Sequence, residues 1–250
     1  IAMPMMLAWY FSKREGHAKT ADFIIGGLLL LVPATLIIKQ PDLGTGLLIT
    51  ASGFYVLFLA GLSWKLLVGG AIAFAASTPV LWSMLHDYQR RRIEILLDPT
   101  QDPLGAGYHT IQAIIALGSG GSAGKGWLQG TQTQLDFLPE RTTDFIFAVF
   151  GEEFGFLGNI LLLLLFSLII MRGLYIASQA QSTFTRLLAG SITLTFFTYA
   201  FVNIGMVSGI LPVVGVPLPL ISYGGTSMVT LCLSFGILMS IQTHKKLVAS

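Results

Sequence analysis

The sequence has few charged residues: 14 Lys and Arg and 12 Asp and Glu make up 10% of its 250 residues. The single cysteine, Cys232, excludes an intrachain disulfide. The net charge of +2 is small and the basic residues are scattered, which argues against a nucleic-acid-binding protein. By contrast, 54% of the residues are hydrophobic, and the charge content is well below that of a soluble domain. These proportions predict an integral membrane protein.

Long apolar runs divide the chain into segments that can span a membrane. The first run, residues 1–11, has about half of the roughly 20 residues that a spanning helix needs, and is interpreted as the end of a span. We therefore expect that an N-terminal portion is missing. Full spans are expected at 22–38, 45–62, 66–85, 144–171, 187–211 and 223–241. The fold class is accordingly an all-α integral membrane protein, a polytopic helix bundle forming a single membrane domain over 1–250.

The segment 86–143 differs from the rest, because hydrophobicity falls and Gly, Gln, Thr and charged residues accumulate. A connection this long is expected to be functional or disordered. Within it, Tyr108, Ile111, Ile114 and Ile115 recur at helical spacing. This predicts a short helix over 106–117, which lies either in the membrane interface or on the protein's own surface. The order of the spans and a small excess of Lys and Arg, eight of fourteen, in the opposite loops favour 86–143 as a large extracytoplasmic loop.

Three consecutive arginines, Arg90, Arg91 and Arg92, lie in this loop although the positive-inside rule disfavours them there. Either the orientation is reversed, or the arginines lie outside because they bind an anionic ligand or the acids of the same segment. Mutual neutralisation by those acids is favoured for any single arginine. Those acids are Asp87, Glu94, Asp98, Asp102, Asp136 and Glu140. The histidines, at 17, 86, 109 and 244, are too dispersed to predict a zinc site.

Residues 212–222 are apolar but contain Pro212, Pro217 and Pro219, which cannot lie in a helix interior. Irregular backbone at membrane depth is tolerated only where protein or a water-filled cavity satisfies it. The segment is therefore predicted to be a re-entrant or capping loop beside a cavity. Ser222 follows, just before the last span. It either helps the helix N-terminus to bind an anion or simply caps the helix.

Carboxylates cluster between residues 135 and 158, immediately before and inside an apolar run: Asp136, Glu140, Asp144, Glu152 and Glu153. Such a cluster is costly unless it faces water, a cavity or partners. Asp144 lies where a polar loop becomes a helix, so it is either an ordinary N-cap or a catalytic carboxylate. Glu152 and Glu153 lie roughly 12 Å further along the axis. For them a buried, hydrogen-bonded or ion-paired structural role is favoured.

Three motifs carry a resemblance to a known family. They are Lys-Gln-Pro-Asp-Leu-Gly-Thr at 39–45, Phe-Leu-Pro-Glu-Arg-Thr-Thr-Asp-Phe-Ile-Phe-Ala-Val-Phe-Gly-Glu-Glu-Phe-Gly at 137–155, and Pro-Val-Val-Gly-Val-Pro-Leu-Pro-Leu-Ile-Ser-Tyr-Gly-Gly at 212–225. In this order the chain resembles the SEDS family (shape, elongation, division and sporulation), and particularly its rod-shape branch. The resemblance covers nearly the whole chain. It implies ten membrane helices with both ends cytoplasmic, of which the segments here would be the fourth to the tenth.

The resemblance implies a peptidoglycan glycosyltransferase of the bacterial inner membrane, which polymerises lipid II on the extracytoplasmic side during cell elongation. The family's catalytic aspartate falls on Asp144, and a further family acid, eight residues earlier, falls on Asp136. The family usually has His where this chain has Thr142, so any catalytic role of that His does not carry over. The partners implied are a class B penicillin-binding protein, which is a transpeptidase, and the elongation machinery.

In such a reaction an acceptor sugar hydroxyl attacks an anomeric carbon and a lipid pyrophosphate leaves. Asp144 is predicted to be the general base. The pyrophosphate needs cationic stabilisation, for which Arg141, Lys125, the 90–92 run or a divalent cation (Mg²⁺ or Mn²⁺) are candidates. The predicted substrate-binding set is therefore Asp136, Glu140, Arg141, Lys125, Arg90, Arg91 and Ser222.

The same composition is compatible with two other functions: a lipid II flippase and a non-catalytic scaffold of the elongation machinery. A flippase needs polar groups through the bilayer midplane. Here the polar residues concentrate in the outer loop, and only a few, such as Glu152, Glu153 and Asn203, lie deeper. A scaffold would tolerate substitution of the carboxylates. The enzyme is the preferred interpretation.

Overall fold

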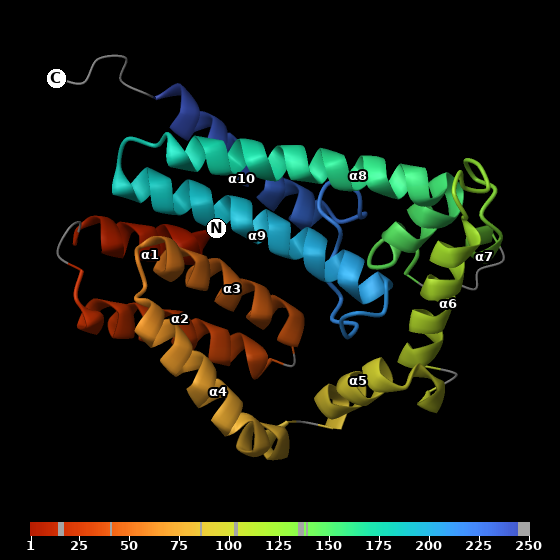
Figure 1. Ribbon diagram of the computed structural model, residues 1–250, viewed down its shortest axis with the longest axis horizontal. Helices are drawn as coiled ribbons and strands as arrows, with labels where there is room; N and C mark the ends of the chain where they lie inside the picture. Colours follow the sequence, from red (N-terminus) through yellow and green to blue (C-terminus); the bar gives the residue numbers. More distant parts are fainter. Residues whose placement is uncertain are drawn as a thin grey trace. The chain divides into compact units, whose positions relative to one another are not determined.

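The computed structural model describes residues 1–14, 18–40, 42–85, 87–102, 105–134, 138 and 140–244, and within these ranges it contains helices and no strand (Figure 1). The helices that follow the predicted spans are α1 (Ala2–Ser12), α2 (Thr20–Ile38), α3 (Leu43–Leu59), α4 (Trp64–Met84), α8 (Ile146–Ser178), α9 (Thr183–Val207) and α10 (Gly225–Thr243). Between α4 and α8 lie α5 (Asp87–Leu97), the 3₁₀ turn η1 (Pro99–Gln101), α6 (Ala106–Ser119) and α7 (Thr131–Gln134). The predicted all-α fold is confirmed.

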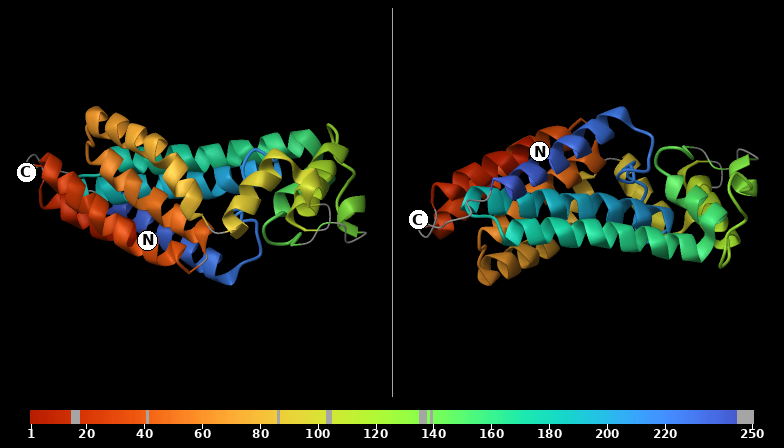
Figure 2. Two further views of the ribbon diagram at one scale, coloured as in Figure 1. Left: turned by 90° about the horizontal axis from the view of Figure 1, so that it is seen from below. Right: turned by 90° about the horizontal axis from the view of Figure 1, so that it is seen from above.

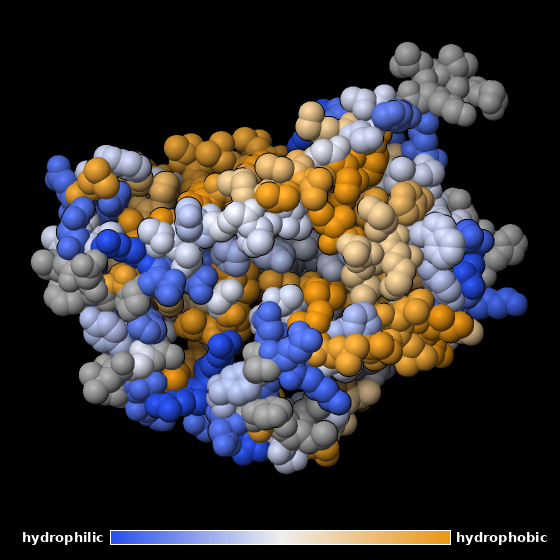
Figure 3. Space-filling view, turned by 180° about the vertical axis from the view of Figure 1, so that it is seen from behind, coloured by the Kyte–Doolittle hydropathy of each residue, from blue (hydrophilic) through white to orange (hydrophobic). Residues whose placement is uncertain are grey.

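The helices present the surface of a membrane protein. Of those described, α2, α8, α9 and α10 are long and apolar enough to cross a bilayer, and α3 and α4 contribute the shorter apolar stretches Gly44–Leu59 and Trp64–Val80. Large apolar side chains of α8, such as Leu161 and Leu168, are more than half exposed. Figure 3 shows broad hydrophobic areas on one face of the molecule. Exposed apolar area of this extent suits lipid rather than water.

The chain divides into two compact units, and α8 and α9 contribute to both. The first contains Ile1–Leu62, Leu164–Ala200 and Gly224–Ser250. In it α2 and α1 both pack against α3 (Figures 1 and 2). Its buried core includes Leu7, Phe11 and Leu187. The buried Ser191 hydroxyl donates to the Ser52 carbonyl at 2.7 Å, a polar link between helices of the kind that membrane bundles use.

The second unit contains Ser63–Leu163 and Phe201–Tyr223, and it holds most of the predicted site residues. The described part of segment 86–143 is largely helical, so the short helix predicted over 106–117 is confirmed as α6. The helices α5 and α7 were not predicted. In α6, Thr110, Ala113 and Ala116 are buried, whereas Ile114 and Ile115 are exposed. The helix thus packs on the protein through its small side chains, and the exposed isoleucines leave its position in the membrane interface a prediction.

The helix α8 is broken at Gly155, whose φ of 64° and ψ of −161° are not helical. The loop 120–126 replaces the lost helical hydrogen bonds. It does so through four backbone bonds of 2.9 to 3.1 Å: Phe156 N to Gly121 O, Leu157 N to Ser122 O, Lys125 N to Glu152 O, and Gly126 N to Glu153 O. Irregular backbone inside an apolar helix is thus satisfied by protein.

We expect the variant Gly124→Ala to weaken this junction. Gly124 has φ +79°, and a Cβ there would lie 2.1 Å from the Glu153 carbonyl oxygen. Strain and displacement of the loop should cost roughly 1–3 kcal/mol. Thermal unfolding in detergent measures this. The matched control is Gly118→Ala, where a Cβ in α6 meets no atom within 4 Å and the helix gains propensity. Equal melting temperatures for the two variants would contradict the prediction.

Candidate active site

Asp144 lies in a turn, residues 140–145, directly before α8. The Glu140 carbonyl accepts hydrogen bonds from the N–H groups of Thr143 (3.1 Å) and Phe145 (3.2 Å), and the helix begins at Ile146, two residues later than predicted. Within the described part of the chain, the Asp144 carboxylate makes no hydrogen bond or ion pair. An ordinary N-cap carboxylate would accept from the first turn. The N-cap interpretation of Asp144 is therefore not supported.

The backbone around Asp144 is held by the segment Phe201–Tyr223 of the same unit. Three successive carbonyls of the turn each accept one hydrogen bond from this segment. Tyr223 N donates to Thr142 O at 2.8 Å, Ser222 Oγ to Thr143 O at 2.6 Å, and Asn203 Nδ2 to Asp144 O at 2.8 Å. The Asp144 main chain is thus fixed while its side chain is left without a partner among the described residues.

The proline-containing loop 212–222 is irregular and packs beside this turn. Its residues Val216 and Leu218 are buried, and Asn203 Nδ2 also donates to Val216 O at 2.7 Å. Gly215 has φ +75°, and a Cβ there would lie 3.4 Å from Asp144 Oδ2. The loop therefore borders the Asp144 carboxylate, and glycine keeps the approach open. Its re-entry into the membrane beside a cavity stays a prediction.

Burial raises the pKa of the Asp144 carboxyl above its ordinary value, and the negative charge of Glu140 raises that pKa further. The Glu140 carboxylate is held in place by Thr143 Oγ1, which donates to it at 2.8 Å. From α6, His109 lies against Phe145, with ring centroids 6.3 Å apart. The 212–222 loop contributes no charged side chain. A carboxylate with a raised pKa is a stronger base than an ordinary one.

We expect the variant Glu140→Gln to move the acid limb of the pH–rate profile to lower pH. If Asp144 is the general base, as predicted, its deprotonated form is the active one, and activity rises with pH through its pKa. Removing the neighbouring negative charge lowers that pKa, while the amide oxygen can still accept from Thr143. Polymerisation rate as a function of pH is the measurement, with Glu94→Gln in α5 as a control of equal charge change. An unmoved limb, or an equal shift in the control, would contradict the assignment.

A second cluster surrounds Glu152, which is fully buried. Lys125 Nζ forms an ion pair with Glu152 Oε1 at 2.7 Å. The other groups that donate to the carboxylate are Gln132 N (3.0 Å), Thr131 Oγ1 (3.2 Å) and Thr133 Oγ1 (3.3 Å). Ser119 Oγ lies 3.5 Å from Glu152 Oε1 but donates its proton to Ala116 O at 2.9 Å. The predicted structural role of Glu152, hydrogen-bonded and ion-paired, is confirmed.

The structure places two predicted cations beside this second cluster. Lys125 donates to Glu152 and, at 2.7 Å, to Thr131 Oγ1, so two of its three N–H donors are in use. Arg141 donates to the Thr133 carbonyl oxygen. Both hold α7 and its neighbouring loop. The predicted role of both cations toward pyrophosphate stays a prediction.

Ser222 differs from its predicted role. The helix α10 begins at Gly225, with Gly224 as its N-cap and without a side-chain cap. The Ser222 oxygen accepts from Leu218 N at 2.7 Å, and its single O–H donates to Thr143 O. A hydroxyl has one proton to donate. Ser222 is therefore neither the cap of α10 nor a donor available to an anion.

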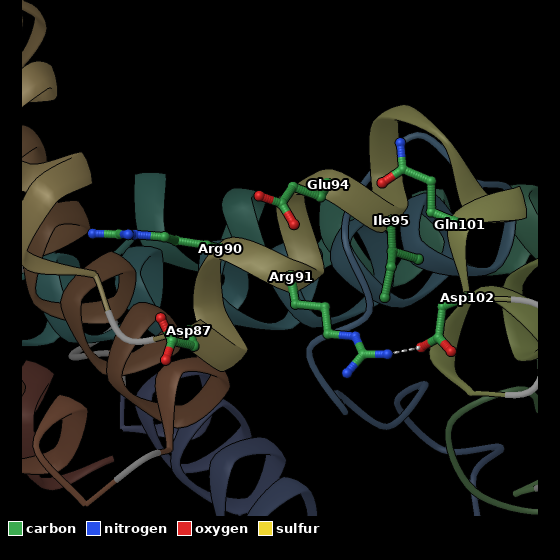
Figure 4. A pocket seen from close by; sticks show the side chains of 7 residues that line it. All are labelled: Asp87, Arg90, Arg91, Glu94, Ile95, Gln101 and Asp102. Atoms are coloured by element: carbon green, nitrogen blue, oxygen red, sulfur yellow. Dashed lines mark ion pairs between the residues drawn. The ribbon is translucent and has the colours of Figure 1, made fainter.

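Arg90 and Arg91 lie on α5 beside a surface pocket lined by Asp87, Glu94, Ile95, Gln101 and Asp102 as well (Figure 4). Arg91 pairs with Asp102 at 3.3 Å, and Arg90 points away from that pair and donates to the carbonyls of Trp82 and Ser83 at the end of α4. Three acids line the pocket beside two arginines, which favours mutual neutralisation over anion binding. Asp136 lies outside the described residues.

Among the residues that the structure describes, no three His, Cys, Asp or Glu side chains converge on a metal position. Asp144 and Glu140 are two carboxylates whose charges interact. Mg²⁺ is commonly held by one or two carboxylates together with substrate phosphates. Asp144 must keep its carboxylate free to act as the predicted base, so a divalent cation would take its ligands mainly from the substrate phosphates and water.

Asn203 is a residue of the candidate site to which the sequence assigned no role. It is fully buried in the last turns of α9 and donates to two carbonyls, one of them that of Asp144. The available signal was its polarity inside an apolar span, since such residues are costly and commonly functional. Its partner could not be read from the sequence, because it is 59 residues away.

The fold and site define a polytopic helical membrane protein with a fixed, partly buried carboxylate beside an irregular loop. The FTSW_RODA_SPOVE family, described as cell cycle protein, matches residues 1–247, and the chain belongs to this family. It is 56% identical over 250 residues to peptidoglycan glycosyltransferase MrdB of Escherichia coli K12, covering 100% of this chain and 68% of that protein. It is 43% identical to the Helicobacter pylori protein of the same name, covering 96% and 63%.

Two solved structures are similar as well. One is a chain of a peptidoglycan synthase complex, with a TM-score of 0.81 and 32% identity, covering 96% of this chain and 67% of the other. The other is the rod shape determining protein RodA of Thermus thermophilus, with a TM-score of 0.64 and 26% identity, covering 98% and 64%. The family expected from the three sequence motifs is thereby confirmed.

Proposed function

We propose that the protein is a peptidoglycan glycosyltransferase that polymerises lipid II into glycan strands, with Asp144 as general base. The observation that carries this is the Asp144 carboxylate, which has a raised pKa and a fixed backbone, and lacks a partner among the described residues. A structural carboxylate would be paired, as Glu152 is. The names of the similar proteins from Escherichia coli and Helicobacter pylori support the same activity.

The reaction joins two sugars with inversion. The oxygen of the acceptor hydroxyl attacks the anomeric carbon while Asp144 accepts the proton of that hydroxyl. The bond between the anomeric carbon and the lipid pyrophosphate breaks on the opposite face. Gly215 leaves room for the acceptor beside Asp144 Oδ2. Arg141 and Lys125 are the candidates to stabilise the departing pyrophosphate. We infer that Asp136 and Glu140 help to orient the sugar substrate.

A multi-pass protein of this family would act in the bacterial inner membrane with Asp144 and segment 86–143 on the extracytoplasmic side, where lipid II is consumed. A class B penicillin-binding protein would cross-link the strand, and the elongation machinery would direct both. The similarity to a peptidoglycan synthase complex supports such a partner.

The test is polymerisation of purified lipid II by the whole protein and its transpeptidase partner, with the partner's own chemistry blocked by a β-lactam. Long glycan strands support the proposal. If no strands form but lipid II crosses the bilayer of reconstituted vesicles, the protein is a flippase. If neither occurs in a well-folded preparation, the scaffold is favoured.

We further propose that a divalent cation, held mainly by the substrate phosphates, neutralises the departing pyrophosphate. Chelation should then lower the polymerisation rate, and Mg²⁺ or Mn²⁺ should restore it. Thermal unfolding in the presence and absence of chelator serves as the control, because a structural cation would change the melting temperature. Full activity after exhaustive chelation would contradict this role.

A further inference from the structure

Three residues outside the catalytic motif hold the three carbonyls of residues 142, 143 and 144. Two of the donors are side chains, Asn203 and Ser222, and can be removed by substitution; the third is the backbone N–H of Tyr223. None of these contacts involves the Asp144 carboxylate. Because the Asp144 side chain has no partner of its own in the described chain, its direction depends on the backbone that carries it.

The Asn203 carboxamide is used in an unusual way. Both hydrogen bonds of Nδ2 go to carbonyl oxygens, those of Asp144 and Val216, which fixes the orientation of the amide. Its Oδ1 is buried and has no partner among the described residues. An unsatisfied buried acceptor costs stability and calls for an explanation. The two hydrogen bonds donated by Nδ2 join the Asp144 turn to the 212–222 loop. We infer that they explain why a residue with an unsatisfied buried oxygen is kept here.

Ser222 provides a second link between the 212–222 loop and the Asp144 turn. Its side chain is almost fully buried and connects Leu218 N within the loop to Thr143 O in the turn. Asn203 and Ser222 thus join the same two segments at neighbouring carbonyls. Movement of the loop would move Asp144 with it, and a displacement of about 1 Å at a reacting group can cost on the order of 100-fold in rate.

We propose that Asn203 and Ser222 are positioning residues that aim the Asp144 carboxylate at the acceptor hydroxyl through its backbone. This rests on the proposed role of Asp144 as general base. Both side chains are buried and donate to backbone carbonyls, so their loss should appear in kcat and leave KM for lipid II unchanged. A freed turn also hydrates Asp144, which lowers its pKa and moves the acid limb of the pH–rate profile downward.

The experiment compares Ser222→Ala and Asn203→Ala with Ser191→Ala in the whole protein with its partner. Ser191 is the matched control, because it is also buried and its hydroxyl donates to a backbone carbonyl at 2.7 Å in the other unit. Melting temperature, KM, kcat and the pH–rate profile are measured for each. Ser222→Thr, which keeps the hydroxyl, is included as the conservative variant.

We expect Ser222→Ala and Asn203→Ala to lose at least ten-fold in kcat with KM within two-fold of wild type, and with the acid limb shifted to lower pH. Ser191→Ala should lose a similar amount of melting temperature but keep its kcat and its pH–rate profile, and Ser222→Thr should recover part of the rate. If both site variants behave as Ser191→Ala does, or if the loss lies in KM, the positioning role is wrong. Asp144→Asn is assayed in parallel: an active Asp144→Asn protein refutes the general base itself, whereas an inactive one leaves the positioning question to the other variants.

Discussion

The variant Asp144→Asn should fold normally and lose polymerisation by roughly 10²- to 10⁴-fold, the usual contribution of a general base. Asparagine has the same size and can occupy the same partly buried position, but its amide does not accept the acceptor's proton. Burial and Glu140 both disfavour the charged carboxylate, since they raise its pKa. Replacing it by a neutral amide should therefore leave the melting temperature unchanged or raise it.

The matched control is Asp98→Asn. Asp98 lies in the same 86–143 segment but accepts from Thr100 N at 3.1 Å at the start of η1, a cap that asparagine provides equally well. Both proteins are compared by lipid II polymerisation and by thermal unfolding. A fully active Asp144→Asn protein would show that another group takes the proton. A loss of activity accompanied by unfolding would show that Asp144 is structural.

The sequence predicted the parts of the molecule that depend on composition and periodicity. Apolar runs long enough to span a membrane became helices, and the carboxylate that ends the polar segment became the candidate base. The start of α8 at Ile146 was displaced by two residues, because the Glu140 carbonyl captures the N–H groups of Thr143 and Phe145 in a turn. Because of these two hydrogen bonds, Asp144 lies outside the helix and its carboxylate does not cap it. Hydropathy does not reveal this.

Contacts between distant segments were beyond the reach of the sequence. The break at Gly155 depends on a loop some thirty residues earlier, which supplies the missing backbone bonds. Ser222 was misplaced for the same reason. Its neighbours predicted a helix start, but its hydroxyl is engaged with Thr143, 79 residues away. Local pattern gives the residue types that a site needs, whereas tertiary pairing decides which of them are available to a substrate.

The variant Lys125→Met should be strongly destabilised, by on the order of 2 to 4 kcal/mol, because it leaves the buried Glu152 charge without its ion-pair partner. The methionine keeps the apolar length of the lysine stem, so packing changes little. The hydrogen bonds that Glu152 accepts from α7 and its neighbours remain, and they limit the loss. Lys125 lies in the loop 120–126, whose backbone hydrogen bonds satisfy α8 where it is broken at Gly155. The loss of stability should therefore also affect the contact between this loop and α8.

The double variant Lys125→Met, Glu152→Gln removes the ion pair without leaving a buried charge unpaired. It therefore distinguishes the effect of losing the pair from the effect of the unpaired Glu152 charge. Glutamine is neutral and retains an acceptor for the surrounding donors, so it should recover most of the melting temperature that Lys125→Met loses. Lys65→Met, at an exposed position of α4, is the control and should behave as wild type. If Lys125→Met loses no more stability than the control, the buried ion pair does not hold the loop. If the double variant regains stability but not polymerisation, Lys125 also acts on the substrate, as expected of a cation that keeps one donor for the pyrophosphate.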